Sequence, residues 1–83
     1  MTYIYLVDGY HPFIDGNPQS AHSKRTGAIA ARRKLIDIFI EDYGLKPRPK
    51  ASSASELRRA QKAARSQGDN DPDAWITKLE LKP

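Results

Sequence analysis

Apolar side chains alternate along the first residues of the chain. Within positions 2–8, Tyr3 and Tyr5 fall on one side of an extended backbone, and Ile4 and Leu6 fall on the other. Aromatic and β-branched residues with a period of two suit a pleated surface. The pattern therefore predicts a strand over residues 2–8 that is apolar on both faces.

The end of the chain carries a second alternating segment. Trp75 and Leu79 alternate with Ile76 and Lys78 within positions 74–81, directly after a turn-forming run that includes a proline. Period-two alternation after a turn signal indicates a strand. We expect a closing strand over residues 74–81.

Helical spacing fills much of the centre. Over residues 24–43 apolar residues recur at three- and four-residue steps, which predicts a helix with one buried stripe. Gly44 can take the left-handed conformation that ends a helix, and Leu45 is then expected to pack back on Ile40 as in a Schellman cap.

A second helix is expected over residues 53–67, closed by Gly68. Ser53 and Glu56 have the spacing of a capping box, in which each side chain satisfies a backbone amide at the helix start. Its apolar stripe is thin, because Leu57 is the one large apolar residue and the others are alanines.

The remaining segments read as connections. Residues 9–23 contain turn-forming prolines and glycines and are expected to form a long loop. Residues 46–52 hold two prolines among basic residues, and this composition predicts a stiff basic linker.

The order of elements is β-α-α-β, which predicts an α+β fold. We expect a small single domain over residues 1–83, with two helices packed on a short sheet of the N- and C-terminal strands. An isolated pair of strands is marginal in water, so extension of the sheet by a second copy, as a homodimer, is an open alternative. Tyr3, Tyr5 and Trp75 are candidate interface aromatics on the exposed side of that sheet.

Charge is concentrated in the middle of the chain. The formal net charge is +4, but residues 24–65 hold twelve Lys or Arg against four Asp or Glu, a local charge of +8. Such asymmetry points to a partner with an acidic or phosphate-bearing surface, and a solvated helical face gives the same pattern. The candidate binding residues are the cations Lys24, Arg25, Arg32, Arg33, Arg48, Arg58, Arg59, Lys62 and Arg65.

The start of the first helix offers a second candidate. Residues 20–27 combine hydroxyls and cations where free backbone amides and the helix dipole attract anions. The competing interpretation is a Ser or Thr cap followed by exposed charge.

Catalysis and cofactors have little support. The chain has no Cys, and His11, His22, Asp8 and Asp15 around the first loop match no metal-binding spacing. No nucleophile motif is present. We therefore expect a protein that is not an enzyme and that binds no metal or other cofactor.

Location and nucleic-acid recognition are also constrained. No apolar run approaches the length needed to span a bilayer, and the N-terminus lacks a signal-peptide pattern, so we expect a cytoplasmic protein with no membrane partner. The connection between the two helices is too long for a helix-turn-helix. Any nucleic-acid binding is therefore expected to be non-specific.

The chain is very short, has no Cys, and is expected to have an opening strand, a helix containing Ala-Ala-Arg at residues 30–32, and a closing strand. In this general style it resembles the small phage-encoded inhibitors of the anti-CRISPR kind. This resemblance implies an inhibitor that docks on a host defence protein or nucleoprotein complex. Many such inhibitors are acidic mimics of nucleic acid, and the basic chain departs from that pattern, which favours docking on an acidic protein surface or on nucleic acid held by the complex. The alternative is a basic, non-specific nucleic-acid-binding protein.

Overall fold

A computed structural model describes residues 2–14 and 16–81 of the chain. Its elements are β1 (Thr2–Tyr10), β2 (Gln19–His22), α1 (Arg25–Asp42), α2 (Ser53–Ser66) and β3 (Asp73–Leu81). The predicted α+β class and the order of an opening strand, two helices and a closing strand are confirmed. Asp15, one of the residues considered for a metal, lies outside the described residues.

The expectation of an unbroken loop over residues 9–23 is wrong. β1 continues to Tyr10, and Gln19–His22 forms a short second strand. This strand has the sequence Gln-Ser-Ala-His and no buried residue, so it carries none of the apolar alternation that marks a strand. Backbone pairing with β1 creates it.

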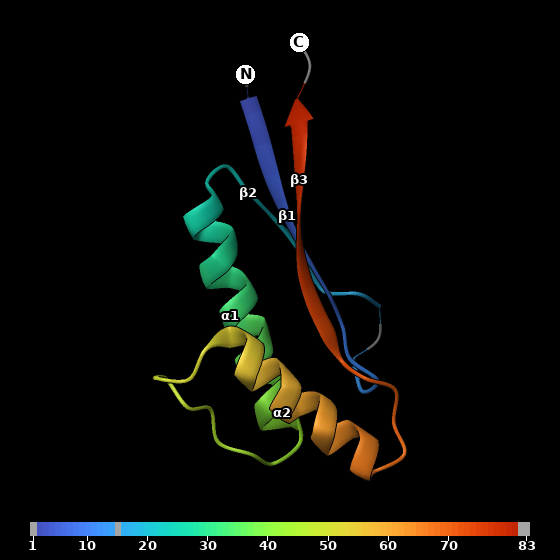
Figure 1. The fold of residues 1–83 in the computed structure, drawn as a ribbon. Coiled ribbons are helices and arrows are strands. Elements are labelled where there is room, and N and C mark those ends of the chain that lie inside the picture. The colour runs from blue at the N-terminus through green and yellow to red at the C-terminus, as the bar shows by residue number, and fades with distance from the viewer. Residues whose placement is uncertain (1, 15, 82–83) are drawn as a thin grey trace.

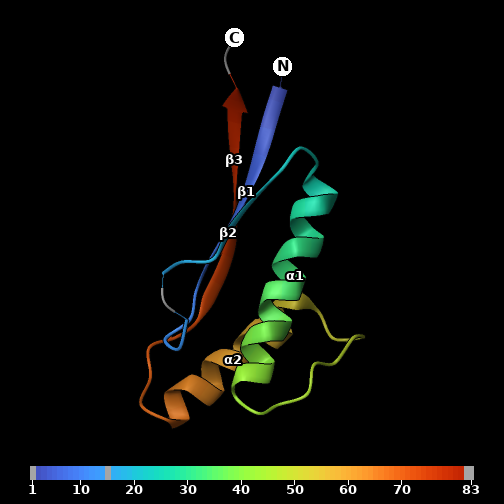
Figure 2. The same ribbon diagram turned by 180° about the vertical axis from the view of Figure 1, so that it is seen from behind.

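β1 lies at the centre of a three-stranded antiparallel sheet of order β2-β1-β3 (Figures 1 and 2). β3 pairs with β1 along its whole length, from Thr2 opposite Leu81 to Tyr10 opposite Asp73. β2 pairs only with the central part of β1, because its last pair joins His22 to Tyr5. The ends of β1 and β3 that carry the chain termini therefore form a two-stranded ribbon, which rises beyond the helices in both views.

The helices cover one face of the sheet. α1 contacts all three strands, whereas α2 packs mainly on α1 and touches β3 near its start (Figure 1). The core lies where these elements meet and consists of Ile36, Phe39, Ile40, Leu57, Ala60 and Ala74. The apolar stripe of α2 consists mainly of alanines. Because their side chains are small, α2 packs closely on α1.

The C-terminus of α1 confirms a prediction, and the N-terminus of α2 contradicts one. Gly44 has a positive φ of 73°, its amide donates to Glu41, and the Leu45 amide donates to the Ile40 carbonyl at 3.1 Å, which is the predicted Schellman arrangement. The capping box at Ser53 is wrong, because Ser52 is the N-cap residue and its hydroxyl accepts a hydrogen bond from the Ser55 amide.

Neither described helix is long and apolar enough to cross a membrane.

Candidate interaction surfaces

Glu56, which was expected to cap the start of the second helix, is fully buried. Its carboxylate accepts hydrogen bonds from the Arg48 amide at 3.0 Å, from Arg48 Nε at 2.9 Å and from Arg59 Nη1 at 2.9 and 3.0 Å. The carboxylate therefore turns toward residues 46–52 instead of capping its own helix. It is the anchor of the segment that the sequence marked as a stiff linker.

The protonation of Glu56 follows from these contacts. Burial alone raises the pKa of this carboxyl, but the hydrogen bonds from Arg48 and Arg59 outweigh burial and lower the pKa to about 2. Glu56 is thus an anion at neutral pH, and its charge is compensated by two guanidinium groups.

Arg33 holds the same segment from α1. Its guanidinium donates to the carbonyl of Arg48 at 2.7 Å and to the carbonyl of Ala51, and its Nε donates to Asp37 at 3.1 Å. Arg59 adds a bond to the Lys46 carbonyl at 2.9 Å. Three of the predicted binding cations therefore fix the linker to the two helices.

Two further cations of the predicted basic face have internal partners. Arg32 Nε donates to the Ala74 carbonyl at 2.7 Å, and Arg65 pairs with Asp71, with its Nε 3.0 Å from a carboxylate oxygen. The hydrogen bond and the charge of Arg65 lower the pKa of Asp71. The nine candidates thus do not form one free basic face, because five of them have hydrogen-bond partners within the fold.

Four candidates stay exposed with no hydrogen bond or ion pair among the described residues: Lys24, Arg25, Arg58 and Lys62. Arg58 and Lys62 lie one turn apart on α2, so they share a face of that helix. Lys24 and Arg25 begin α1, where no side chain caps the helix, so the Ser or Thr cap considered for this position is wrong. The two pairs belong to different helices.

The faces of the sheet follow from its register. A Cβ atom at Gly9 would lie 2.5 Å from Leu35 of α1, so the odd positions of β1 face the helices. Residues directly opposite each other in a sheet share a face. Tyr3 and Tyr5 therefore lie on the helical side, whereas Trp75, opposite Asp8, lies on the open side.

The expectation that Tyr3, Tyr5 and Trp75 share one exposed side is therefore wrong. Period-two alternation identified the strands correctly, but which side of each strand meets the helices depends on the pairing register. Tyr3 is instead a contact of Lys78, whose Nζ lies 4.0 Å from the centre of its ring.

The open face of the sheet is apolar and carries no helix. Trp75, Leu79 and Leu81 are 41%, 43% and 49% exposed, and Ile4 and Leu6 lie half-buried beside them on β1. No Lys or Arg lies on this side of the described strands, whose charged residues there are Asp8 and Asp73. Sequence alone could not separate this face from the helical face.

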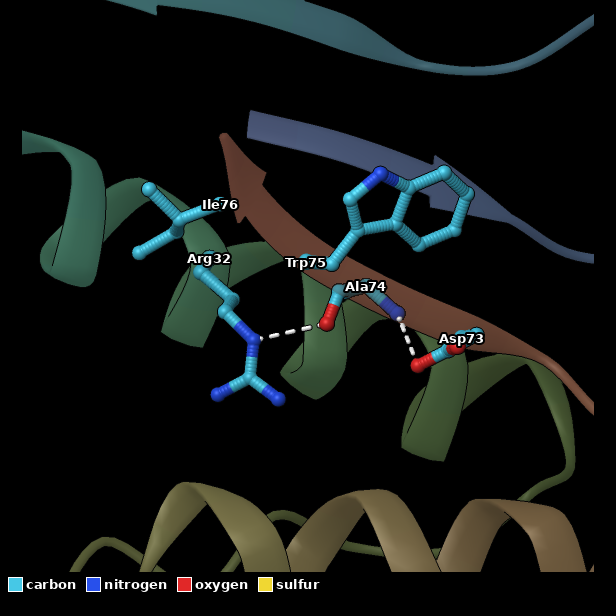
Figure 3. A pocket seen from close by; sticks show the side chains of 5 residues that line it. All are labelled: Arg32, Asp73, Ala74, Trp75 and Ile76. Carbon is cyan, nitrogen blue, oxygen red and sulfur yellow. Dashed lines mark hydrogen bonds between the residues drawn. The ribbon is translucent and has the colours of Figure 1, made fainter. Parts of the chain in front are cut away.

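The outer edge of β3 is partly occupied at its start. The Ala74 amide donates to Asp73 Oδ1 at 2.8 Å, and the Ala74 carbonyl accepts from Arg32. Figure 3 shows Arg32 on one side of β3 and the Trp75 ring on the other, at an open hollow lined by these residues and Ile76. The remaining N–H groups of the Arg32 guanidinium have no protein acceptor among the residues drawn.

His11 is buried against the rings of Phe13, Phe39 and Tyr43. Its Nδ1 accepts a hydrogen bond from the Phe13 amide at 3.1 Å, so the neutral ring carries its proton on Nε2. That Nε2 lies 3.8 Å from Asp42 Oδ2 and has no hydrogen-bond partner.

The other predicted metal candidates are elsewhere. His22 Nε2 lies 2.8 Å from the Ser20 hydroxyl at the end of β2, and Asp8 accepts a hydrogen bond from Gln19 at 2.6 Å. Within residues 2–14 and 16–81, no three His, Cys, Asp or Glu side chains gather closely enough to hold a metal ion.

Comparisons with protein-family models, with curated proteins and with solved structures find no match to this chain.

Proposed function

We propose that this chain is a non-enzymatic binding protein that docks on a protein partner through the open face of its sheet. The observation that carries the proposal is the exposure of Trp75, Leu79 and Leu81 on the open side of β3, where positions 75–81 place no charged residue. Aromatic anchors surrounded by aliphatic side chains are typical of the central part of protein interfaces. The exposed isoleucines of α1, Ile29 and Ile38, are nine positions apart and therefore do not adjoin each other.

The chemistry of this face favours a protein over a nucleic acid. A phosphate backbone requires neighbouring cations, and the described strands place none on the open face, where Asp8 and Asp73 lie. The surface that complements it is apolar with basic residues at its rim. A partner of this kind is consistent with the exposed tryptophan as the central contact.

Site-directed photo-crosslinking tests the proposal in cells of the host. We place a photoreactive residue at Thr77, within the open face, and at Lys34, on the exposed side of α1. The expected result is one protein crosslinked at position 77 and not at position 34. The crosslink should be competed by the unlabelled chain but not by its Trp75→Arg variant.

Crosslinks at position 34 alone would overturn the proposal, as would competition by Trp75→Arg as strong as by the unchanged chain. Circular dichroism of each variant shows that the fold is retained. The Lys34→Arg substitution serves as the matched control, because it changes an exposed side chain outside the open face.

The resemblance to anti-CRISPR inhibitors supplies a more specific version of this proposal. In that version the open face docks on a host defence complex and blocks nucleic-acid binding or nuclease recruitment. The test is phage plating on cells with and without the defence system. Protection of the phage should be lost in Trp75→Arg and kept in Lys34→Arg, and equal plating of all three would contradict it.

Non-specific nucleic-acid binding is the second candidate, and the exposed pair Arg58 and Lys62 favours it. Neither side chain has a carboxylate partner among the described residues. Binding to a labelled duplex and to a single strand at two salt concentrations tests it, because affinity carried by phosphate contacts falls steeply with salt. The absence of binding at low salt would reject this candidate, and binding that is unchanged in the Arg58→Ala, Lys62→Ala double variant would assign it to residues other than this pair.

A further inference from the structure

β3 has a free edge beyond Ala74. Antiparallel strands direct the N–H and C=O groups of alternate residues to the same side. Because both groups of Ala74 point away from β1, those of Ile76, Lys78 and Glu80 point away as well. None of these groups has a hydrogen-bond partner within the described residues, and β3 is an outer strand of the sheet. Such an edge can pair with another strand.

We propose that this edge pairs antiparallel with the β3 strand of a second copy of the chain, about a two-fold axis at Leu79. The two sheets then join into one six-stranded sheet. This goes beyond the docking of a partner protein on the open face, because it concerns the edge and not the face.

The occupied groups of Ala74 limit the register. An axis at Thr77 would place Ala74 opposite Glu80 of the second copy, yet the Ala74 amide and carbonyl already bind Asp73 and Arg32. That register would require both of these bonds to break. It would also bring the second strand toward α2, which contacts the start of β3.

Charge repulsion excludes the register whose two-fold axis lies one residue further along β3. An axis at Lys78 would place two lysines directly opposite each other, and like charges in that position destabilise a strand pair. An axis at Leu79 instead places each Lys78 opposite Glu80 of the other copy, so two opposite-charge pairs form by symmetry. Glu80 has no ion-pair partner within residues 2–14 and 16–81, so its carboxylate is available.

The same axis produces apolar contacts on the open face. Leu79 lies opposite Leu79 of the second copy, and Thr77 lies opposite Leu81. The projecting ends of β1 and β3, which β2 does not reach, become part of a wider sheet (Figure 2). The pairing segment is short, so the interface is below the size of stable dimers and the association is expected to be weak and concentration-dependent.

Sedimentation equilibrium over a range of protein concentrations tests the charge pairs. The unchanged chain should associate to a dimer, and Lys78→Glu and Glu80→Lys should each weaken the dimer by at least about tenfold. In each single variant, positions 78 and 80 carry the same charge, which is negative in Lys78→Glu and positive in Glu80→Lys. An equimolar mixture of the two should dimerise again, because a mixed dimer places opposite charges across the strand pair. The double variant Lys78→Glu, Glu80→Lys should also recover association, and Lys62→Glu on α2 is the matched control.

A cysteine variant tests the axis itself, because the chain has no cysteine of its own. Leu79→Cys should form an intermolecular disulfide rapidly, since facing residues at the axis bring their Cβ atoms within bridging reach. Leu81→Cys should do so at least about tenfold more slowly, because it faces Thr77.

An unchanged chain that is monomeric at millimolar concentration would overturn the proposal, as would equal crosslinking of the two cysteine variants. A double charge-swap variant that folds but does not dimerise would overturn it too. Capture of an unrelated extended peptide by a monomeric chain would assign the edge to another protein and reject self-pairing.

Discussion

Arg48 binds the buried carboxylate of Glu56 twice, once through its backbone amide at 3.0 Å and once through Nε at 2.9 Å. The pair joins a proline-flanked segment to the start of α2. Arg59 binds the same carboxylate from within α2. A single acidic side chain thus organises much of the connection between the two helices.

Replacement of Glu56 by Ala should destabilise the fold strongly. It leaves Arg59 and the Arg48 amide without their acceptor, and breaking a buried charge pair of this kind costs about 3–5 kcal/mol. Urea denaturation measures the change in the free energy of unfolding. Glu41→Ala, an exposed carboxyl at the end of α1, is the control and should change this free energy by less than about 0.5 kcal/mol.

Acid should weaken the fold through the same carboxyl. The pKa of Glu56 is about 2 in the fold and its ordinary value is 4.5, so the unfolded chain binds the proton more tightly. The contribution is complete above pH 4.5 and is lost as the pH falls toward 2, by about 3 kcal/mol in total. Unfolding midpoints measured from pH 6 to pH 2 should show this slope, and Glu56→Gln should reduce it.

His11 should add a second acid-sensitive contribution at higher pH. Burial lowers the pKa of His11 below 6.5, and the nearby Asp42 and Asp69 oppose that shift only in part. Because the unfolded chain binds this proton more tightly, stability is full above pH 6.5 and falls as the pH drops below it. His11→Asn keeps an acceptor for the Phe13 amide but does not titrate. Its stability should be flatter between pH 7 and 5, and an unchanged slope would contradict this assignment.

Arg58 and Arg59 are neighbours on α2, but their replacement should have different effects on the free energy of unfolding. Arg59→Ala removes bonds to Glu56 and to the Lys46 carbonyl and should lower the free energy of unfolding by about 2 kcal/mol. Arg58→Ala should change it by less than about 0.5 kcal/mol. Thermal denaturation distinguishes the two. Any test of nucleic-acid binding should therefore alter Arg58 with Lys62 and leave Arg59 in place.

The sequence by itself determined the class of fold and most of its elements. Apolar periods of two and of three to four identify β1, β3 and α1 because those residues contact the core in a regular order. Gly44 marked the end of α1, since a positive φ is available to glycine at little cost. These signals are local, so they are visible along the chain.

Only the tertiary structure decided what the charged and aromatic residues do. Nine cations look alike in sequence, and their roles separate when Glu56, Asp71 and the carbonyls of Ala51 and Ala74 come within hydrogen-bond distance of five of them. The side of the sheet that Trp75 occupies depends on register against β1. Most of these contacts join different segments of the chain, and periodicity along one segment contains no information about its partner in another.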